Sequence, residues 1–206
     1  MSSSASKSIR QAITEFKSRE PFTPSSFAGL GSRAAIDQTL MRLAKDGGIN
    51  RVARGVYVLA EVSRFGLKAM PEPQAVAEMV AKNEGAQIGI HGAEAVRQFG
   101  LSTQAPTQPV FYTTGSSRRI KMDGLSIRLD HVAPRKLALG DRPAGQALSA
   151  LWYLGKEHVT PETFEKIRNK ISPAEFSALA QARAAMPGWM AAVLMGYEQG
   201  EWCSLS

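Results

Sequence analysis

Polar and basic side chains that could bind an extended partner recur between residues 32 and 54. They are short or forked hydrogen-bonding groups: Ser32, Arg33, Gln38, Arg42, Lys45, Arg51 and Arg54. Guanidinium and amide groups can reach base edges in the major groove, and cationic groups can bind phosphates. These residues are therefore candidates for contact with double-stranded DNA. The alternative is an ordinary solvated helix face followed by a turn.

A second basic patch lies further along the chain and consists of Arg118, Arg119, Lys121 and Arg128. It could contact another stretch of DNA, an RNA or an acidic protein. It could equally protect the edge of a sheet from pairing with another chain. The residue types do not decide between these interpretations, so both stay open.

The positive charge of the chain is concentrated around these two groups. The 206 residues carry a net charge of +7. Residues 1–59 hold nine Lys and Arg against four Asp and Glu, and residues 112–136 hold six against two. Two separate basic regions favour a polyanionic partner.

No group of residues suggests catalysis or metal binding. His91, His131 and His158 are far apart and lack the spacing of metal ligands on one helix face, and Cys203 is the single cysteine. We interpret the histidines as structural, with His91 as a helix cap. The carboxylates are scattered without an acid–base pair. We therefore expect no enzyme activity, no cofactor and no metal, and a nucleic-acid-processing enzyme is the least favoured class.

The first 59 residues are predicted to form three helices and a β-hairpin. The expected helices cover residues 6–19, a short segment from residue 24, and residues 32–46. Thr23 and Ser32 are expected N-caps. Alternating residues predict strands at 49–52 and 56–59 around a tight turn at Gly55. This order is typical of a winged helix-turn-helix, whose third helix enters the major groove while the hairpin, or wing, grips the phosphate backbone.

The remaining residues predict a mixed domain with a small antiparallel sheet followed by helices. A helix is expected at 74–84, a strand at 87–90 and a helix at 92–99. Three strands are expected at 110–113, 118–122 and 125–132, with hairpin turns at 114–116 and at Asp123-Gly124. From residue 142 the pattern is helical, with N-caps at Thr160 and Ser172 and a last helix at 187–199.

The chain is therefore expected to be an α+β protein with two domains. Residues 1–72 would be the winged helix-turn-helix with a proline-bounded connection at 60–72, and residues 73–206 the mixed domain. The N-terminus lacks the apolar core of a signal peptide, and no stretch is long and apolar enough to span a membrane. We expect a cytoplasmic protein without membrane contact.

Several short motifs resemble the N-terminal domain of AbiEi-type antitoxins of type IV toxin–antitoxin systems. They are Leu30-Gly31-Ser32-Arg33, Leu40-Met41-Arg42-Leu43, Gly47, Ile49-Asn50-Arg51 and Arg54-Gly55-Val56-Tyr57. The resemblance covers about the first 60 residues, and beyond them it rests on layout alone. It implies a repressor of its own operon whose C-terminal domain counters a cognate nucleotidyltransferase-like toxin.

The sequence leaves two functions from different classes open. The first is a DNA-binding autorepressor that is also an antitoxin, with operator DNA and a cognate toxin as partners. The second is a transcription regulator whose C-terminal domain senses a ligand or mediates dimerisation. Winged-helix repressors often bind inverted repeats as pairs, but the oligomeric state of this chain does not follow from its sequence.

Overall fold

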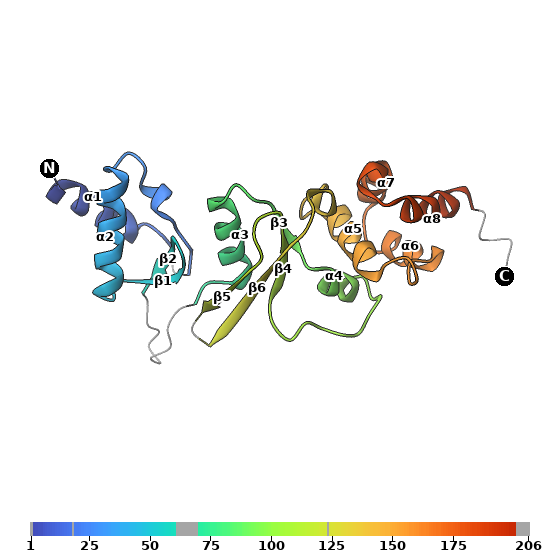
Figure 1. The fold of residues 1–206 in the computed structure, drawn as a ribbon, viewed down its shortest axis with the longest axis horizontal. Helices are drawn as coiled ribbons and strands as arrows, with labels where there is room; N and C mark the ends of the chain where they lie inside the picture. The colour runs from blue at the N-terminus through green and yellow to red at the C-terminus, as the bar shows by residue number, and fades with distance from the viewer. Residues whose placement is uncertain (1, 18, 61–69, 123, 201–206) are drawn as a thin grey trace. The chain divides into compact units, whose positions relative to one another are not determined.

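The structure is a computed structural model that describes residues 2–17, 19–60, 70–122 and 124–200, and it has the predicted α+β composition (Figure 1). Most of the expected connection at 60–72, the turn residue Asp123 and Cys203 lie outside the described residues. None of the described helices has the length and apolar character of a membrane span.

The contacts between residues divide the chain into two compact units. Unit 1 comprises Met1–Gly85 and Arg119–Ile127, and unit 2 comprises Ala86–Arg118 and Arg128–Ser206. The division does not follow the expected boundary at residue 72, because the next helix, α3 (Pro73–Asn83), packs against the hairpin of unit 1. The second basic patch is also divided between the units.

Residues 2–59 form the expected series of helices followed by a hairpin. The elements are α1 (Ser2–Thr14), the 3-10 helix η1 (Pro24–Phe27), α2 (Arg33–Lys45), β1 (Ile49–Ala53) and β2 (Val56–Leu59). Their inward side chains build one core: Ile9, Ile13, Phe22, Phe27, Ile36, Leu40, Ile49 and Tyr57. Thr23 and Ser32 occupy the predicted N-cap positions: the Ser32 hydroxyl accepts from the Ala35 amide, whereas at the start of η1 the Thr23 amide donates to the Ser26 hydroxyl.

Helix α1 ends at Thr14, so the prediction that it runs to Arg19 is wrong. The amides of Glu15 and Phe16 bond to carbonyls three residues back, which tightens the chain into a final turn. The Phe16 ring then lies 4.8 Å from the ring of Phe22 and 5.9 Å from that of Phe27. The helix stops where Phe16 joins this aromatic cluster, a tertiary contact that helical periodicity does not encode.

The sheet has the strand order β3-β4-β6-β5. Its strands are β3 (Ile88–Ile90), β4 (Val110–Thr113), β5 (Arg118–Met122) and β6 (Leu125–His131). Strand β4 pairs antiparallel with β3 but parallel with β6, so the expectation of a purely antiparallel sheet is wrong. The segment 114–116 is not a hairpin turn either, because β5 neighbours β6 and not β4.

Side chains around the end of β4 hold the connection to β5 in place. The Thr113 Oγ1 donates to the Gln87 carbonyl at 3.0 Å, and the Ser117 Oγ accepts from the His131 amide at 2.8 Å. The His131 ring also bonds to the Gly115 carbonyl. These bonds hold the connection after β4 near the ends of β3 and β6. The chain therefore does not fold back on β4 as a hairpin, and β4 pairs in parallel with β6 instead.

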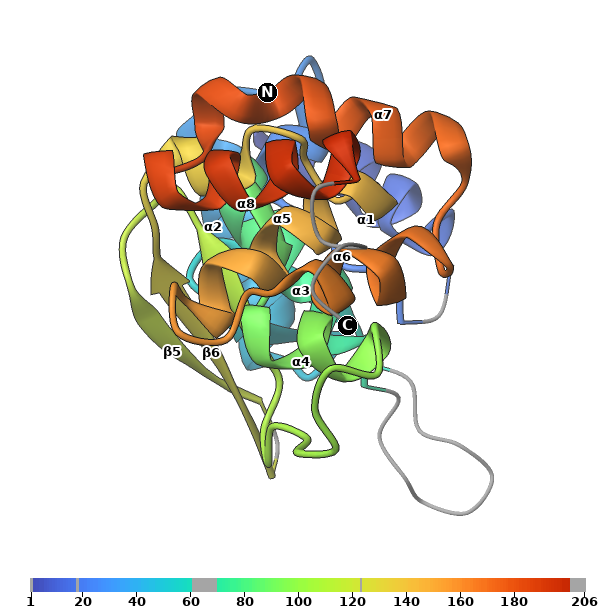
Figure 2. The same ribbon diagram turned by 90° about the vertical axis from the view of Figure 1, so that its right-hand side faces the viewer.

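The rest of unit 2 is helical (Figure 2). The helices are α4 (Gly92–Gln98), the 3-10 helix η2 (Pro134–Leu137), α5 (Pro143–Leu154), α6 (Pro161–Arg168), α7 (Pro173–Gln181), the 3-10 helix η3 (Ala182–Ala185) and α8 (Gly188–Gln199). Helix α5 is at the centre of the core, with Ala144, Ala147, Leu148 and Leu151 fully buried. Thr160 and Ser172 occupy the predicted N-cap positions of α6 and α7.

His91 caps α4, as the sequence predicts. Its Nδ1 accepts a hydrogen bond from the Ala93 amide at 3.2 Å, so Nδ1 carries no proton in this arrangement. The ring packs between Tyr112 and Tyr153, and its Nε2 lies 3.8 Å from Asp130. Burial holds the pKa of His91 below the 6.5 that is ordinary for histidine, against the opposing effect of Asp130.

This arrangement predicts a stability that falls in mild acid. The unfolded chain binds a proton at His91 more readily than the folded one, so the stabilisation is complete above about pH 6.5 and is lost as the pH falls through the lowered pKa. Asn is also a good N-cap, so His91→Asn should keep the helix start but flatten the fall of Tm between about pH 7 and pH 5. The control is His131→Asn, which removes a different histidine of the same unit. Equal pH profiles for wild type and His91→Asn would contradict this account.

Candidate nucleic-acid interface

Helix α2 presents a continuous outward face. Ala34, Gln38, Met41 and Lys45 follow one another at helical spacing and are all exposed, with the exposed Arg42 beside them. The opposite side of the helix buries Ile36, Thr39 and Leu40. Of the candidate residues from sequence, Gln38, Arg42 and Lys45 therefore share one accessible face.

Ser32 and Arg33 are placed differently from these three. The Ser32 hydroxyl accepts from the Ala35 amide at 3.3 Å and serves as the N-cap. The Arg33 Nε donates to the Asp37 Oδ2 at 2.9 Å. Both members of this ion pair are largely exposed, so it contributes well under ~1 kcal/mol and a phosphate could replace Asp37. Arg33, one of the candidates predicted from sequence, therefore lies at the flank of the helix in an exposed ion pair.

The hairpin places Arg51 and Arg54 in solvent. Strand β1 pairs antiparallel with β2, and Gly55 turns the chain with a φ of +73°, a conformation that favours glycine. Arg54 immediately precedes this glycine, and both arginines are exposed. The hairpin therefore carries two accessible cations close to its tip.

Two contacts that the sequence did not predict hold the hairpin in position. The backbones of Phe22 and Tyr57 exchange two hydrogen bonds of 2.8 and 2.9 Å, which join the segment after α1 to β2. The Asn83 Nδ2 at the end of α3 donates to the Gly55 carbonyl at 3.4 Å. A strand-like Phe-Thr pair before Pro24 was the available signal for the first contact, whereas the second joins residues too far apart for local patterns to predict.

Several cations of the second basic region have partners inside the protein. Both Nε and Nη2 of Arg128 donate to Asp130, at 3.1 and 2.9 Å. The Arg118 Nε lies 3.4 Å from the Ser116 carbonyl, and the cations of Arg135 and Lys136 lie over the Trp152 ring. Much of this positive charge therefore has a structural use.

Arg119 and Lys121 lie on the edge strand β5 and are exposed, in alternation with the buried Ile120 and Met122. This alternation is what a charged, protected sheet edge requires. The structure thus keeps the second basic patch as four residues near one hairpin but leaves Arg119 and Lys121 as its accessible members.

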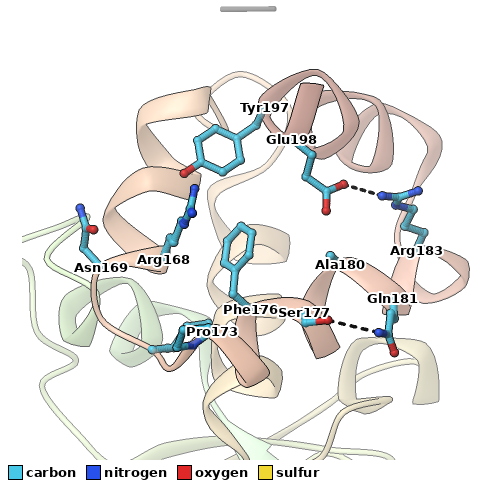
Figure 3. A pocket seen from close by; sticks show the side chains of 11 residues that line it. Arg168, Asn169, Pro173, Phe176, Ser177, Ala180, Gln181, Arg183, Tyr197 and Glu198 are labelled. Carbon is cyan, nitrogen blue, oxygen red and sulfur yellow. Dashed lines mark hydrogen bonds and ion pairs between the residues drawn. The ribbon is translucent and has the colours of Figure 1, made fainter. Parts of the chain in front are cut away.

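Unit 2 also contains an open pocket of about 750 Å³ between α6, α7 and α8 (Figure 3). Phe176 points into it, with Arg168 and Tyr197 on one side and the ion pair of Arg183 and Glu198 on the other (Figure 3). The hydrogen bond to Tyr197 raises the pKa of Arg168 further above its ordinary value. The described residues contain no cluster of His, Cys, Asp or Glu that could hold a metal ion.

Comparison with protein families gives a match over residues 8–177 to a family described as a family of unknown function, DUF6088. The chain belongs to this family. The DUF6088 match runs from within α1 to within α7, so the family includes elements of both units.

No curated protein matches the sequence. Among solved structures, the chain is similar to the crystal structure of the RV2827C protein from Mycobacterium tuberculosis, with a TM-score of 0.44 and 14% identity. That alignment covers 95% of this chain and 77% of the other.

Proposed function

We propose that the protein binds double-stranded DNA through unit 1, which acts as a winged helix-turn-helix. Helix α2 would enter the major groove, and the hairpin of β1 and β2 would be the wing. The observation that carries the proposal is the outward face of α2, whose exposed Gln38, Arg42 and Lys45 precede a hairpin with exposed Arg51 and Arg54. The strand-like pairing of Phe22 with Tyr57 supports it, because it ties the segment between the first two helices to the wing.

The charges in this region suit a phosphate backbone. Arg42, Lys45, Arg51 and Arg54 are four exposed cations, and Asp37 is compensated by Arg33. If each of the four cations neutralises one phosphate, the logarithm of the affinity falls with the logarithm of the salt concentration with a slope of about −3 to −4.

The test is a salt titration of full-length protein on labelled duplex DNA by fluorescence anisotropy. We expect Arg54→Ala to weaken binding to all sequences alike and to reduce the salt slope by about one unit, since a wing arginine most often meets phosphate. The matched control is Lys156→Ala, which removes an exposed cation in unit 2 and should leave the slope unchanged. Absent or salt-independent binding by the wild type would refute the proposed function.

We also propose the biological role that the AbiEi resemblance implies. Unit 1 would repress the protein's own operon, and unit 2 would counter a nucleotidyltransferase-like toxin. The support is the set of motifs between Leu30 and Tyr57. Toxicity of a neighbouring gene product, relieved by this protein, is the measurement that tests it.

A ligand-sensing regulator is the second candidate, and the pocket of unit 2 favours it. A cleft of about 750 Å³ that combines the Phe176 ring with the Arg168 guanidinium suits a small anion with an apolar body. The test is to add a small carboxylate to the duplex-binding measurement. A change in the duplex affinity of wild type but not of Arg168→Ala would favour the ligand-sensing regulator.

A further inference from the structure

The outward face of α2 has an apolar centre that phosphate binding does not explain. Met41 is 64% exposed, which makes it the most exposed large apolar side chain in the described part of the chain. Ala34 lies two turns before it on the same face, and the exposed Gln38 lies between them. A single exposed methionine is common on a protein surface, but a helix that enters a groove can bury it there.

The same three side chains line a shallow hollow of the surface. They share it with Gly31 and Ser32 just before the helix, with Ala35 and Asp37 on the helix, and with Ala5 of α1. Ser32 and Ala34 are small and exposed, which lets a partner approach the first turns of α2 closely, whereas Gly31 packs against Ala5 of α1. These are the turns of a recognition helix that contact base edges.

We propose that this apolar centre reads A·T base pairs, with Met41 and Ala34 against the C5-methyl groups of thymine and Gln38 on adenine. The proposal rests on DNA binding by unit 1. An A·T pair offers an adenine edge that matches a glutamine amide, and a methyl group that gains from apolar contact. A cytosine in the same place would lose hydration of its amino group against Met41 without a hydrogen bond in return.

The arginines of α2 are consistent with this preference. Guanine is most often read by an arginine that bonds to its O6 and N7 atoms. Arg33 is the one arginine in the first two turns of α2, and it lies at the flank of the helix beside Asp37 rather than in the outward row of Ala34, Gln38 and Met41. The next arginine, Arg42, follows Met41 directly but lies beside the outward row and not in it. The outward row that would face the base edges therefore presents an amide and two apolar side chains, with the Arg33–Asp37 ion pair at its flank.

The test begins with duplexes selected by the full-length protein from a randomised DNA library. Each thymine of the best duplex is then replaced by deoxyuridine, which pairs identically but lacks the methyl group. We expect a loss of about fourfold in affinity at the one or two thymines that meet Met41 and Ala34, the value of one buried methyl group.

Met41→Ala is the decisive variant. It should weaken binding to the thymine duplex, and deoxyuridine at the Met41-dependent position should then cost little further affinity. Met195→Ala, an exposed methionine of α8 in unit 2, is the matched control and should retain the wild-type sensitivity. Because Met41 is exposed, circular dichroism should show both variants folded.

The outcomes separate this proposal from the proposed function. Salt-dependent binding in which no thymine is sensitive to loss of its methyl group, or selection of G·C pairs at the contacted positions, would overturn the A·T preference and leave DNA binding intact. Sensitivity that persists unchanged in Met41→Ala would overturn the role of Met41. No salt-dependent binding to any duplex would refute the proposed function and this proposal together.

Discussion

Reversing the charge of Arg42 and Lys45 together is expected to abolish duplex binding by the full-length protein at moderate salt. Both side chains are exposed on the outward side of α2, and Lys45 is on the same face as Gln38. Arg42→Glu with Lys45→Glu removes two attractions and adds two repulsions against phosphate. We expect a loss of more than about a hundredfold in affinity, measured by anisotropy at the salt concentration at which wild type binds well.

A reversal of equal charge elsewhere shows whether position or net charge matters. Arg119→Glu with Lys121→Glu changes the net charge by the same amount at two exposed sites on the edge strand β5. We expect this double variant to lower duplex affinity by less than about threefold, because the alternation of exposed charges and buried apolar residues on β5 fits protection of a sheet edge. If this variant stays folded and also abolishes binding, β5 is a second DNA contact, which its place in unit 1 would allow.

The parts of the fold that the sequence predicted correctly depend on local chemistry. Ser32 and His91 cap the helices that follow them, because a cap bonds to an amide two or three residues away. Gly55 forms the turn of the hairpin because few residues adopt its backbone conformation. Each of these features is encoded within a few adjacent residues.

The errors arose where distant residues meet. Helix α1 is shorter at its C-terminal end because Phe16 joins Phe22 and Phe27, and β4 pairs with β6 in a direction that no local pattern fixes. The predicted boundary at residue 72 assigned the helix expected at 74–84 to the second domain, whereas Asn83 at the end of α3 bonds to the Gly55 carbonyl at the tip of the hairpin.

The candidate site was predicted by residue type more than by arrangement. Gln38, Arg42 and Lys45 were predicted from their residue types as candidates for DNA contact, and the structure leaves all three exposed. It did not anticipate that Asp37 holds Arg33, although their spacing of four residues is a signal for such a pair. It also gave no role to Met41, because an apolar residue on a polar face is informative only once its exposure is known.

The second large effect is expected at Gly145, in the first turn of α5. A Cβ at this position would lie 1.9 Å from the Gly140 carbonyl oxygen, and that oxygen belongs to backbone that cannot rotate away. The turn is fixed on both sides, because the Gly140 amide bonds to Leu137 and the Gly145 amide bonds to Arg142. Relief of the clash would therefore have to move α5, which carries the fully buried Leu148 and Leu151.

We expect Gly145→Ala to destabilise the protein by about 3 kcal/mol or more and to lower Tm by roughly 6–12 °C. Gly188→Ala is the matched control, because Gly188 also begins a helix of unit 2 but a Cβ added there would meet no atom within 4 Å. Alanine loses less backbone entropy on folding, so this control should be neutral or stabilised by up to about 1 kcal/mol. Equal melting temperatures for the two variants would contradict this prediction. They would mean that the backbone around Gly140 shifts at little cost in free energy when a Cβ is added at position 145.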